Sequence, residues 1–546
     1  MRGRRLLTMA GLALGPLLVL AVFFVLPVSG MIGRGFVVDG RFDVSGVVDV
    51  LGRPRTHRVL WFTVWSAGLA TICSVVLGLP AAYVLHRLAF PLRNLVRALL
   101  LVPFVLPTVV VGVAFRLLVG ESGPLGFLGL DGTPVAIIAG LTFFNVAVVI
   151  RAVGVAWESL DPRPAEAAAA LGATPAQVFR TVTFPALRPA LVSAASVVFL
   201  FCATSFGVVL TLGGLRYSSV ETEIYLLTTQ LLDLQAAAAL SILQLLAVTA
   251  LLVLAGRLRR VPDPTVERRT ARPRPVRRQD AGQLALTFLT LALVAAPILT
   301  LVLGSLRAHG EWTLANYRNL DSVGAGNALL VPVTSALVTS LRTAVDATWM
   351  ALLLGGLIAV VVSRRSVSPA ERRLRSTLDG IFMLPLGVSA VTLGFGFLIT
   401  LDRPPLELRE SPLLVPIAQA LVALPLVVRI LVPVLAGADD RQRQAAASLG
   451  AGPLRAFATV DLPLVWRPLL AAAGFAFAIS LGEFGATSFL FRDEHPTLPV
   501  VIYQLIGRPG SDNFGMALAA SVVLAAATAL VVLVVDRFGT RSLGTF

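Results

Sequence analysis

Residues 166–172 read Glu-Ala-Ala-Ala-Ala-Leu-Gly, and Phe184-Pro185 follows after a short interval. Residues 444–450 read Gln-Ala-Ala-Ala-Ser-Leu-Gly, and Leu462-Pro463 follows at the same interval. The two copies lie 278 positions apart, and long apolar segments flank each of them. This pattern indicates a duplicated membrane protein that carries one matching polar site in each half.

The composition supports a membrane protein. The chain is 56% hydrophobic and 14% charged, with a mean hydropathy of +0.86, whereas a soluble domain carries roughly 25% charged residues. Apolar runs of about 20 residues, long enough to cross a bilayer, recur along the chain. They predict spans near 6–28, 61–85, 99–119, 135–155, 190–212, 234–254, 284–306, 335–362, 378–400, 413–435, 469–490 and 516–535. We therefore expect an all-α integral membrane protein of about twelve transmembrane helices.

The placement of the charges predicts the topology. The net charge is +15, and arginines gather before the first span and in alternate loops, whereas the loop 120–134 has none. This bias predicts cytoplasmic termini in a multi-pass protein of the inner or plasma membrane, and it makes nucleic-acid binding improbable. The first outer loop is an exception, with five arginines: Arg34, Arg41, Arg53, Arg55 and Arg58.

All 45 basic residues are arginine, and the chain contains no lysine. The common phosphate-binding loop of ATPases requires a lysine, and Schiff-base catalysis requires one as well. We expect no catalytic residues and no bound cofactor, so ATP, if it is used, is hydrolysed by another polypeptide. The four histidines are scattered without ligand spacing, and no metal site is expected.

The sequence divides into three parts. Residues 1–255 form a first repeat of six spans, 256–283 an arginine- and proline-rich cytoplasmic linker, and 284–546 a second repeat of six spans. Because both repeats begin and end on the same side, they are expected to be parallel, with a translocation pathway between them.

The repeated polar loops are predicted to form small helical modules. Asp161 and Asp439 can cap a helix, the alanine runs favour helix, and Gly172 and Gly450 suit the left-handed residue that ends it. Thr174 to Gln177 has the pattern of a capping box that opens a second short helix. Two such modules at matched positions indicate a docking element for another protein.

These loops resemble the inner-loop motif of permease subunits from binding-protein-dependent ABC importers, in the subgroup where two six-span permeases are fused. Trp312-Thr313-Leu314-Ala315-Asn316-Tyr317 adds to the resemblance. The resemblance implies two cytoplasmic ABC ATPase subunits and an extracytoplasmic solute-binding protein as partners. It places the ATPase-docking residues at Glu166, Ala167, Ala168, Gly172, Pro185, Gln444, Ala445, Ala446, Gly450 and Pro463. Because Gln444 replaces the acid of the first copy, the two ATPase contacts are expected to differ in energy.

Three residues are candidates for the translocation pathway. Glu483 lies inside the predicted span 469–490, where a carboxylate is costly unless it faces a cavity or a partner. Ser205 occupies the matching position of the first repeat, and Asn145 lies in another span. The alternative for Glu483 is a packing contact. Asn145, Thr204 and Thr211 are also expected to form hydrogen bonds between helices.

The sequence indicates the substrate less strongly than it indicates the partners. Residues 480–485, 497–499 and 503–507 are similar to thiamine importer permeases, and permeases for ferric iron share much of this pattern. The competing hypothesis is a twelve-helix ion-coupled secondary transporter. It requires several buried acids, for which only Glu483 and Asp346 are candidates, and it does not account for the paired alanine-rich loops.

Overall fold

The structure is a computed structural model that describes residues 2–38, 41–100, 102–214, 216–258, 273–364, 368–403, 406–437 and 439–538. The chain forms two compact units. Among the described residues, unit 1 contains residues 2–50, 224–245 and 317–538, and unit 2 contains residues 51–223 and 246–316. Residues 259–272 of the predicted linker 256–283 lie outside the described residues.

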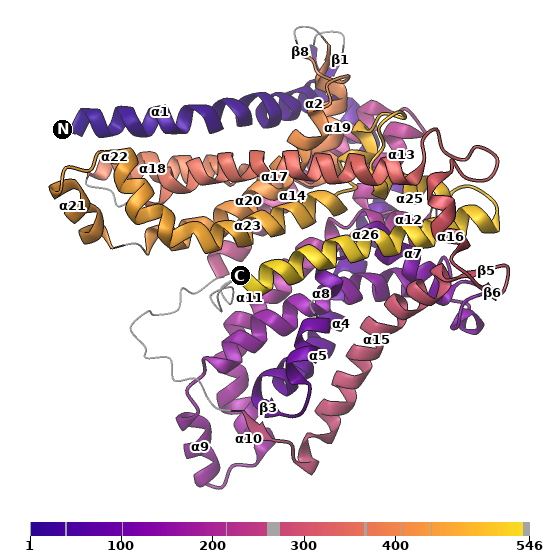
Figure 1. Cartoon of the computed structure of the whole chain (residues 1–546), viewed down its shortest axis with the longest axis horizontal. Coiled ribbons are helices and arrows are strands. Elements are labelled where there is room, and N and C mark those ends of the chain that lie inside the picture. The colour runs from indigo at the N-terminus through magenta and orange to yellow at the C-terminus, as the bar shows by residue number, and fades with distance from the viewer. Residues whose placement is uncertain are drawn as a thin grey trace. The chain divides into compact units, whose positions relative to one another are not determined.

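Helices make up almost all of the regular structure (Figure 1). In the first half they are α1 (Arg2–Leu20), η1 (Ala21–Val25), α2 (Leu26–Phe36), α3 (Ser45–Gly52), α4 (Pro54–Arg87), α5 (Arg93–Leu99), α6 (Val102–Val105), α7 (Thr108–Val119), η2 (Gly126–Leu128), α8 (Pro134–Glu158), α9 (Arg163–Ala170), α10 (Pro175–Val178), η3 (Phe179–Thr183), α11 (Phe184–Ala203), α12 (Gly207–Gly213), α13 (Val220–Thr229) and α14 (Leu234–Leu258).

The second half repeats this order. Its helices are η4 (Arg278–Asp280), α15 (Ala281–Ser305), α16 (Ala315–Arg318), η5 (Asn319–Asp321), α17 (Val333–Ser363), α18 (Pro369–Phe382), η6 (Leu384–Gly387), α19 (Ala390–Thr400), α20 (Leu414–Ala436), α21 (Asp440–Ser448), α22 (Pro453–Ala456), η7 (Phe457–Asp461), α23 (Leu462–Gly482), α24 (Thr487–Leu490), α25 (Leu498–Ile506) and α26 (Ser511–Phe538).

The strands are two-residue pairs in loops. The antiparallel pairs are β1 (Val37–Val38) with β2 (Arg41–Phe42), β5 (Arg307–Ala308) with β6 (Glu311–Trp312), and β7 (Asp402–Arg403) with β8 (Leu406–Glu407). The parallel pair is β3 (Leu88–Ala89) with β4 (Arg274–Pro275).

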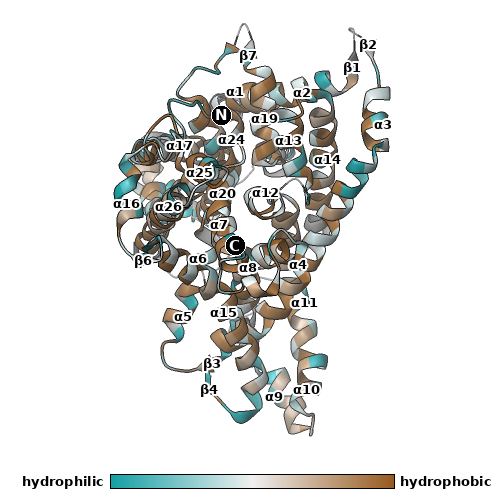
Figure 2. Cartoon of the chain, turned by 90° about the vertical axis from the view of Figure 1, so that its right-hand side faces the viewer, coloured by the Kyte–Doolittle hydropathy of each residue, from teal (hydrophilic) through white to brown (hydrophobic). Residues whose placement is uncertain are grey.

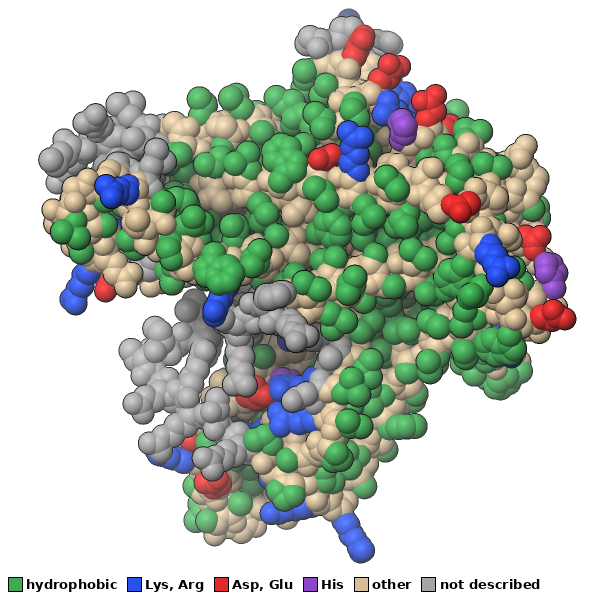
Figure 3. Space-filling model, in the orientation of Figure 1, with side chains coloured by type: hydrophobic (Ala, Val, Ile, Leu, Met, Phe, Trp, Pro, Cys, Tyr) green, Lys and Arg blue, Asp and Glu red, His purple; other side chains and the backbone are tan. Residues whose placement is uncertain are grey.

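Within the described residues, ten helices are long and apolar enough to cross a membrane, and two shorter apolar helices, α7 and α19, accompany them. Apolar residues run along the long helices, and polar residues gather in the loops and at helix ends (Figure 2). The space-filling view likewise shows hydrophobic side chains over much of the visible face (Figure 3). The architecture confirms the expected all-α membrane protein.

Four predicted spans, 99–119, 190–212, 378–400 and 469–490, are interrupted in the structure. α7 begins only after Pro107, which has no N–H to continue a preceding helix. In the second repeat η6 contains Pro385, and α19 restarts at Ser389, whose side chain accepts a hydrogen bond from the Thr392 N–H at 3.0 Å. A hydropathy window does not register such breaks, because the residues around them remain apolar.

The first helix of each half packs against helices of the other half. In unit 1, α1 and α2 contact α17 and α19, and the rings of Phe23 and Phe397 lie 5.9 Å apart. In unit 2, α15 contacts α4 and α7, and the Thr290 hydroxyl donates to the carbonyl of Leu77 at 3.3 Å. The compact units therefore exchange their first helices relative to the sequence halves.

The same kind of close helix contact occurs at matching positions in each half. A Cβ placed on Gly78 of α4 would lie 2.8 Å from the Cβ of Val149 in α8, and one placed on Gly355 of α17 would lie 3.1 Å from the Cβ of Val427 in α20. Glycine is required at both sites because the helices approach so closely. The duplication thus extends to the contacts of the helix core.

An ion pair accounts for one arginine of the first outer loop. Arg55, at the start of α4, contacts Glu223 of α13 through Nε at 2.5 Å and Nη2 at 3.0 Å. Glu223 is buried, so its charge requires a partner. Arg55 is therefore a structural counter-ion, which explains its departure from the charge bias of the loops.

Candidate functional site

The first predicted docking loop folds as a capped helix, α9. An Asp161 carboxylate oxygen accepts the N–H of Arg163 at 3.1 Å, which confirms the predicted cap. At the other end, the Gly172 N–H donates to the Ala169 carbonyl at 3.0 Å and the Ala173 N–H to the Ala168 carbonyl at 3.1 Å. This is the Schellman arrangement, and Gly172 has the positive φ of +88° that it requires.

The second loop repeats the first almost bond for bond. Asp439 accepts the N–H of Arg441 at 2.9 Å. At the end of α21, Gly450 donates to Ala447 at 3.0 Å and Ala451 to Ala446 at 3.0 Å, and Gly450 has φ +83°. The sequence predicted both caps and both glycine ends, because these contacts are local.

A leucine at the tip of each helix was not predicted as functional. Leu171 and Leu449 are each 89% exposed. Single exposed apolar residues are common on proteins, but here the same residue is exposed at the same position of both repeats. The repetition of Leu-Gly in the sequence was the available signal. We define the docking tips as residues 166–172 and 444–450.

The remaining residues of the docking tips are also accessible. Glu166, Ala167, Gln444 and Ala445 are exposed, and a Cβ on Gly172 or Gly450 would meet no atom within 4 Å. Small side chains on an exposed helix allow the backbone of another protein to come close. The tips are therefore accessible to another protein.

A second short helix joins each docking tip to a membrane helix. In the first repeat, Thr174 and Gln177 form the predicted capping box of α10. One turn of π-helix follows in each repeat, η3 in the first and η7 in the second, at matched positions. Pro185 and Pro463 then occupy the first turn of α11 and α23, where proline is tolerated. These two prolines therefore belong to the membrane helices that follow the docking tips and not to the tips themselves.

Different charged clusters hold the two loops. In the first repeat Glu158, at the end of α8, contacts His86 at 2.9 Å, Arg97 at 2.7 Å and Arg93 at 3.7 Å. Burial and the neighbouring Arg97 lower the pKa of Arg93 from its ordinary value. None of these four residues belongs to α9, so this cluster fixes the base of the loop.

In the second repeat the charged cluster includes the docking helix itself. Asp461, whose side chain is 2% exposed, contacts Arg443 of α21 at 2.7 Å and Arg364 at 3.4 Å. This cluster was not predicted, because its members are far apart along the chain.

Among the pathway candidates, Glu483 lies at a break in its predicted span. α23 ends at Gly482, and the Glu483 carboxylate accepts the N–H groups of Ala486 at 2.7 Å and Thr487 at 3.0 Å, together with the Thr487 hydroxyl. The buried carboxylate therefore caps the short helix α24. These bonds are local to the segment, so both the role in the pathway and the packing contact stay predictions.

Ser205 marks the same break in the first repeat, between α11 and α12, and is buried. Asn145 of α8 donates to the Sγ of Cys202 in α11 at 3.3 Å, which confirms the expected contact between helices. Thr204 and Thr211 donate instead to carbonyls within their own segments, those of Leu200 and Gly207, so the prediction for these two was wrong.

The interrupted helices meet in pairs within each unit. In unit 2, a Cβ on Gly207 would lie 3.0 Å from the Cβ of Thr108, at the start of α7. In unit 1, a Cβ on Gly394 of α19 would lie 2.7 Å from the Cα of Ala486. The breaks thus fall at corresponding positions of the two repeats. These breaks could not be predicted from hydropathy, because the residues on either side of them are apolar.

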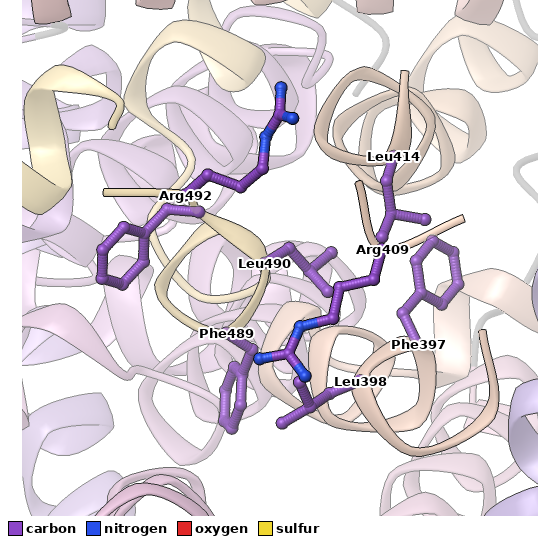
Figure 4. A pocket seen from close by; sticks show the side chains of 8 residues that line it. Phe397, Leu398, Arg409, Leu414, Phe489, Leu490 and Arg492 are labelled. Atoms are coloured by element: carbon purple, nitrogen blue, oxygen red, sulfur yellow. The ribbon is translucent and has the colours of Figure 1, made fainter. Parts of the chain in front are cut away.

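A small pocket lies at the opposite end of α20 from the docking helix α21 (Figure 4). Phe397, Phe489 and other apolar side chains line it, and Arg409 points into its centre. Arg409 pairs with Asp402 at 3.1 Å, and Arg492 donates to the carbonyl of Glu410 at 2.8 Å. This end of unit 1 therefore presents arginine side chains beside an apolar surface.

Comparison with known proteins shows that both duplicated loops lie within matches to one protein family. The family described as "Binding-protein-dependent transport system inner membrane component" matches the chain twice, over residues 74–268 and 351–542. The chain belongs to this family. Each match contains one docking tip, and the chain is the permease component of an ABC importer with two fused repeats.

Several permeases resemble the chain over most of its length. It is 29% identical to the thiamine transport system permease protein ThiP of Brucella abortus over 89% of this chain and 88% of that protein. It is 28% identical to the protein of the same name from Escherichia coli, over 82% and 83% of the two chains. The sulfate transport system permease protein CysT of Salmonella typhimurium is 31% identical, but over only 46% of this chain.

The family implies two kinds of partner, an ATPase and a solute-binding protein. The family match also argues against the competing hypothesis of an ion-coupled secondary transporter. The apolar helices agree with a protein of the inner membrane.

Proposed function

We propose that this chain forms the translocation pathway of an importer and that two ATPase subunits dock on its two tips from the cytoplasm. The observation that carries the proposal is the closely similar backbone geometry of the tips, each of which ends in an exposed leucine and a left-handed glycine. A pair of equivalent sites suits a pair of equivalent partners. The arginine bias of the loops supports cytoplasmic tips and termini.

In this proposal ATP binding draws the two ATPases together and carries the tips with them. The movement shifts the permease between states that open to opposite sides, and hydrolysis resets it. The driving force is the difference in affinity of the ATPases for the two states. The chain itself performs no bond chemistry, and its partner hydrolyses ATP.

We further propose that an extracytoplasmic binding protein delivers the solute at the end opposite the tips. The breaks after α11 and α23 are the proposed positions of the pathway, with Ser205 and Glu483 at matching places. Helix breaks free backbone groups that can contact a solute within the membrane.

Thiamine is the proposed cargo. The proposal rests on the names of the relatives that match most of the chain and on the motifs in the second repeat. Titration of the purified binding protein with thiamine and with chelated Fe(III) tests it. Heat release with thiamine alone supports the assignment, whereas binding of Fe(III) alone contradicts it.

Co-purification of the ATPase tests the docking proposal. Leu171→Asp and Leu449→Asp introduce a charge at side chains that make little contact with their own chain, so folding is expected to be unaffected. The double variant is expected to lose the ATPase on affinity purification. Leu330→Asp, at an exposed leucine outside both tips, is the matched control and is expected to retain it. Retention of the ATPase by the double variant would contradict docking at the tips.

A further inference from the structure

The buried carboxylate of Asp461 connects the second docking helix to the membrane helices. Arg443 lies one residue before the motif in α21, and its Nε and Nη2 both lie 2.7 Å from Oδ1 of Asp461. Asp461 ends η7, directly before α23. Both donors meet the same carboxylate oxygen, and hydrogen bonds between charged groups are stronger than those between neutral groups.

Two further contacts extend the connection. Nη2 of Arg443 donates to the carbonyl of Leu435, near the end of α20, at 3.3 Å. The other carboxylate oxygen of Asp461 accepts from Arg364, just after α17, at 3.4 Å. The three charged side chains thus join α21 to α17, α20 and α23.

The burial of these groups makes the connection stiff. The side chain of Asp461 is 2% exposed and that of Arg443 13%. Removing one partner of a buried pair leaves a charge without compensation, which is strongly unfavourable. α21 cannot move away from the membrane helices without breaking the pair. It is therefore held more firmly than a helix that is attached only through its connecting loops.

The first repeat lacks this connection. At the register of the repeats, Ala165 stands in place of Arg443 and Thr183 in place of Asp461. Arg87 matches Arg364; within the described residues its buried Nη1 has no hydrogen-bond partner, and its charge interacts electrostatically with Glu166 of α9. The first repeat therefore keeps one member of the cluster and has lost the other two.

We propose that Arg443, Asp461 and Arg364 form a strut that transmits the movement of docking helix α21 to the membrane helices of unit 1, while α9 follows its ATPase more loosely. The inference rests on the proposed docking function for its consequence in transport. The three are positioning residues, since none of them is placed in contact with the solute.

The strut itself is tested in the purified full chain, without any partner. A spin label at Leu449→Cys reports on the end of α21, and one at Leu171→Cys on the end of α9; Cys73 and Cys202 are replaced in all samples. Asp461→Asn, which keeps the shape but not the charge, is expected to abolish the immobile spectral component at position 449 and to leave position 171 unchanged. An unchanged spectrum at position 449 would overturn the strut.

The unsatisfied Nη1 of Arg87 allows the converse experiment. Ala165→Arg together with Thr183→Asp builds the missing members into the first repeat, and the label at position 171 is expected to lose mobility. Ala165→Arg alone is the matched control and is expected to have little effect. If the double variant is as mobile as the control, the three-residue cluster does not determine the stiffness of the loop.

The coupling role is tested in the complex with the ATPase, using tritiated thiamine as the probe. Asp461→Asn is expected to keep ATP hydrolysis but to lower the amount of thiamine taken up per ATP, whereas Thr183→Ala keeps the ratio. An unchanged ratio for Asp461→Asn contradicts transmission through the strut. If the wild-type chain binds no ATPase, the proposed function is contradicted instead. The spin-label experiment does not depend on that outcome, because it uses the chain without a partner.

Discussion

At the scale of single residues, Glu166 and Gln444 occupy the same exposed position of the two docking tips and differ only in charge. A carboxylate in the first turn of a helix interacts favourably with the helix dipole, and it can also pair with a basic group on a partner. The neutral amide of Gln444 offers hydrogen bonds alone. The two contacts should consequently respond differently to salt.

Glu166→Gln is expected to weaken ATPase binding roughly two- to five-fold at low ionic strength, as for an exposed ion pair, and to make binding less sensitive to salt. Titration of the ATPase at two salt concentrations measures both effects. Gln444→Glu is the reciprocal control and is expected to increase the salt dependence. An equal salt response for wild type and Glu166→Gln would rule out an ionic contact at this position.

At the scale of elements, the sequence predicted what depends on neighbouring residues. The caps at Asp161 and Asp439 and the ends at Gly172 and Gly450 follow from residue type and spacing, and the structure contains them. The breaks in the apolar spans were not predicted, because hydropathy does not distinguish a continuous helix from two apolar pieces. Glu483 was therefore placed inside a helix when it lies at the end of one.

The cap at Glu483 leads to a prediction about stability. Glu483→Ala removes the acceptor of two buried N–H groups and a hydroxyl, and unsatisfied buried donors cost about 1–3 kcal/mol each. We expect a lower thermal unfolding temperature of the purified chain. Ser205→Ala, at the matching break, is the control and is expected to change the unfolding temperature little. Equal unfolding temperatures for the two variants would show that the cap does not stabilise this segment.

At the scale of the whole molecule, the exchange of first helices could not be foreseen from the sequence. Each half has six apolar segments in the same order, and a hydropathy pattern does not say which neighbour a helix will choose. The packing of α2 against α19 instead depends on side chains far apart in the chain, such as Gly30 and Thr400. The strut of Arg443, Asp461 and Arg364 escaped prediction for the same reason.

The exchange predicts a specific cross-link. A Cβ on Gly30 would lie 3.4 Å from the Cβ of Thr400, close to the separation of about 3.5–4.5 Å found in disulfides. With Cys73 and Cys202 replaced, Gly30→Cys together with Thr400→Cys is expected to form a disulfide. After cleavage at a protease site inserted in the linker, the halves should migrate together without reductant.

Either cysteine alone serves as the control and should give separate halves. Separation of the halves in the double variant would show that α2 does not pack against α19.

The central claim is that this permease moves its solute only when a separate ATPase acts on its docking tips. The most direct measurement is uptake of tritiated thiamine into proteoliposomes that contain the chain, its ATPase and its binding protein. We expect accumulation that requires ATP and disappears when the ATPase is omitted or when Leu171 and Leu449 are both replaced by aspartate. Accumulation by the chain alone, driven by a proton or sodium gradient, would contradict the account.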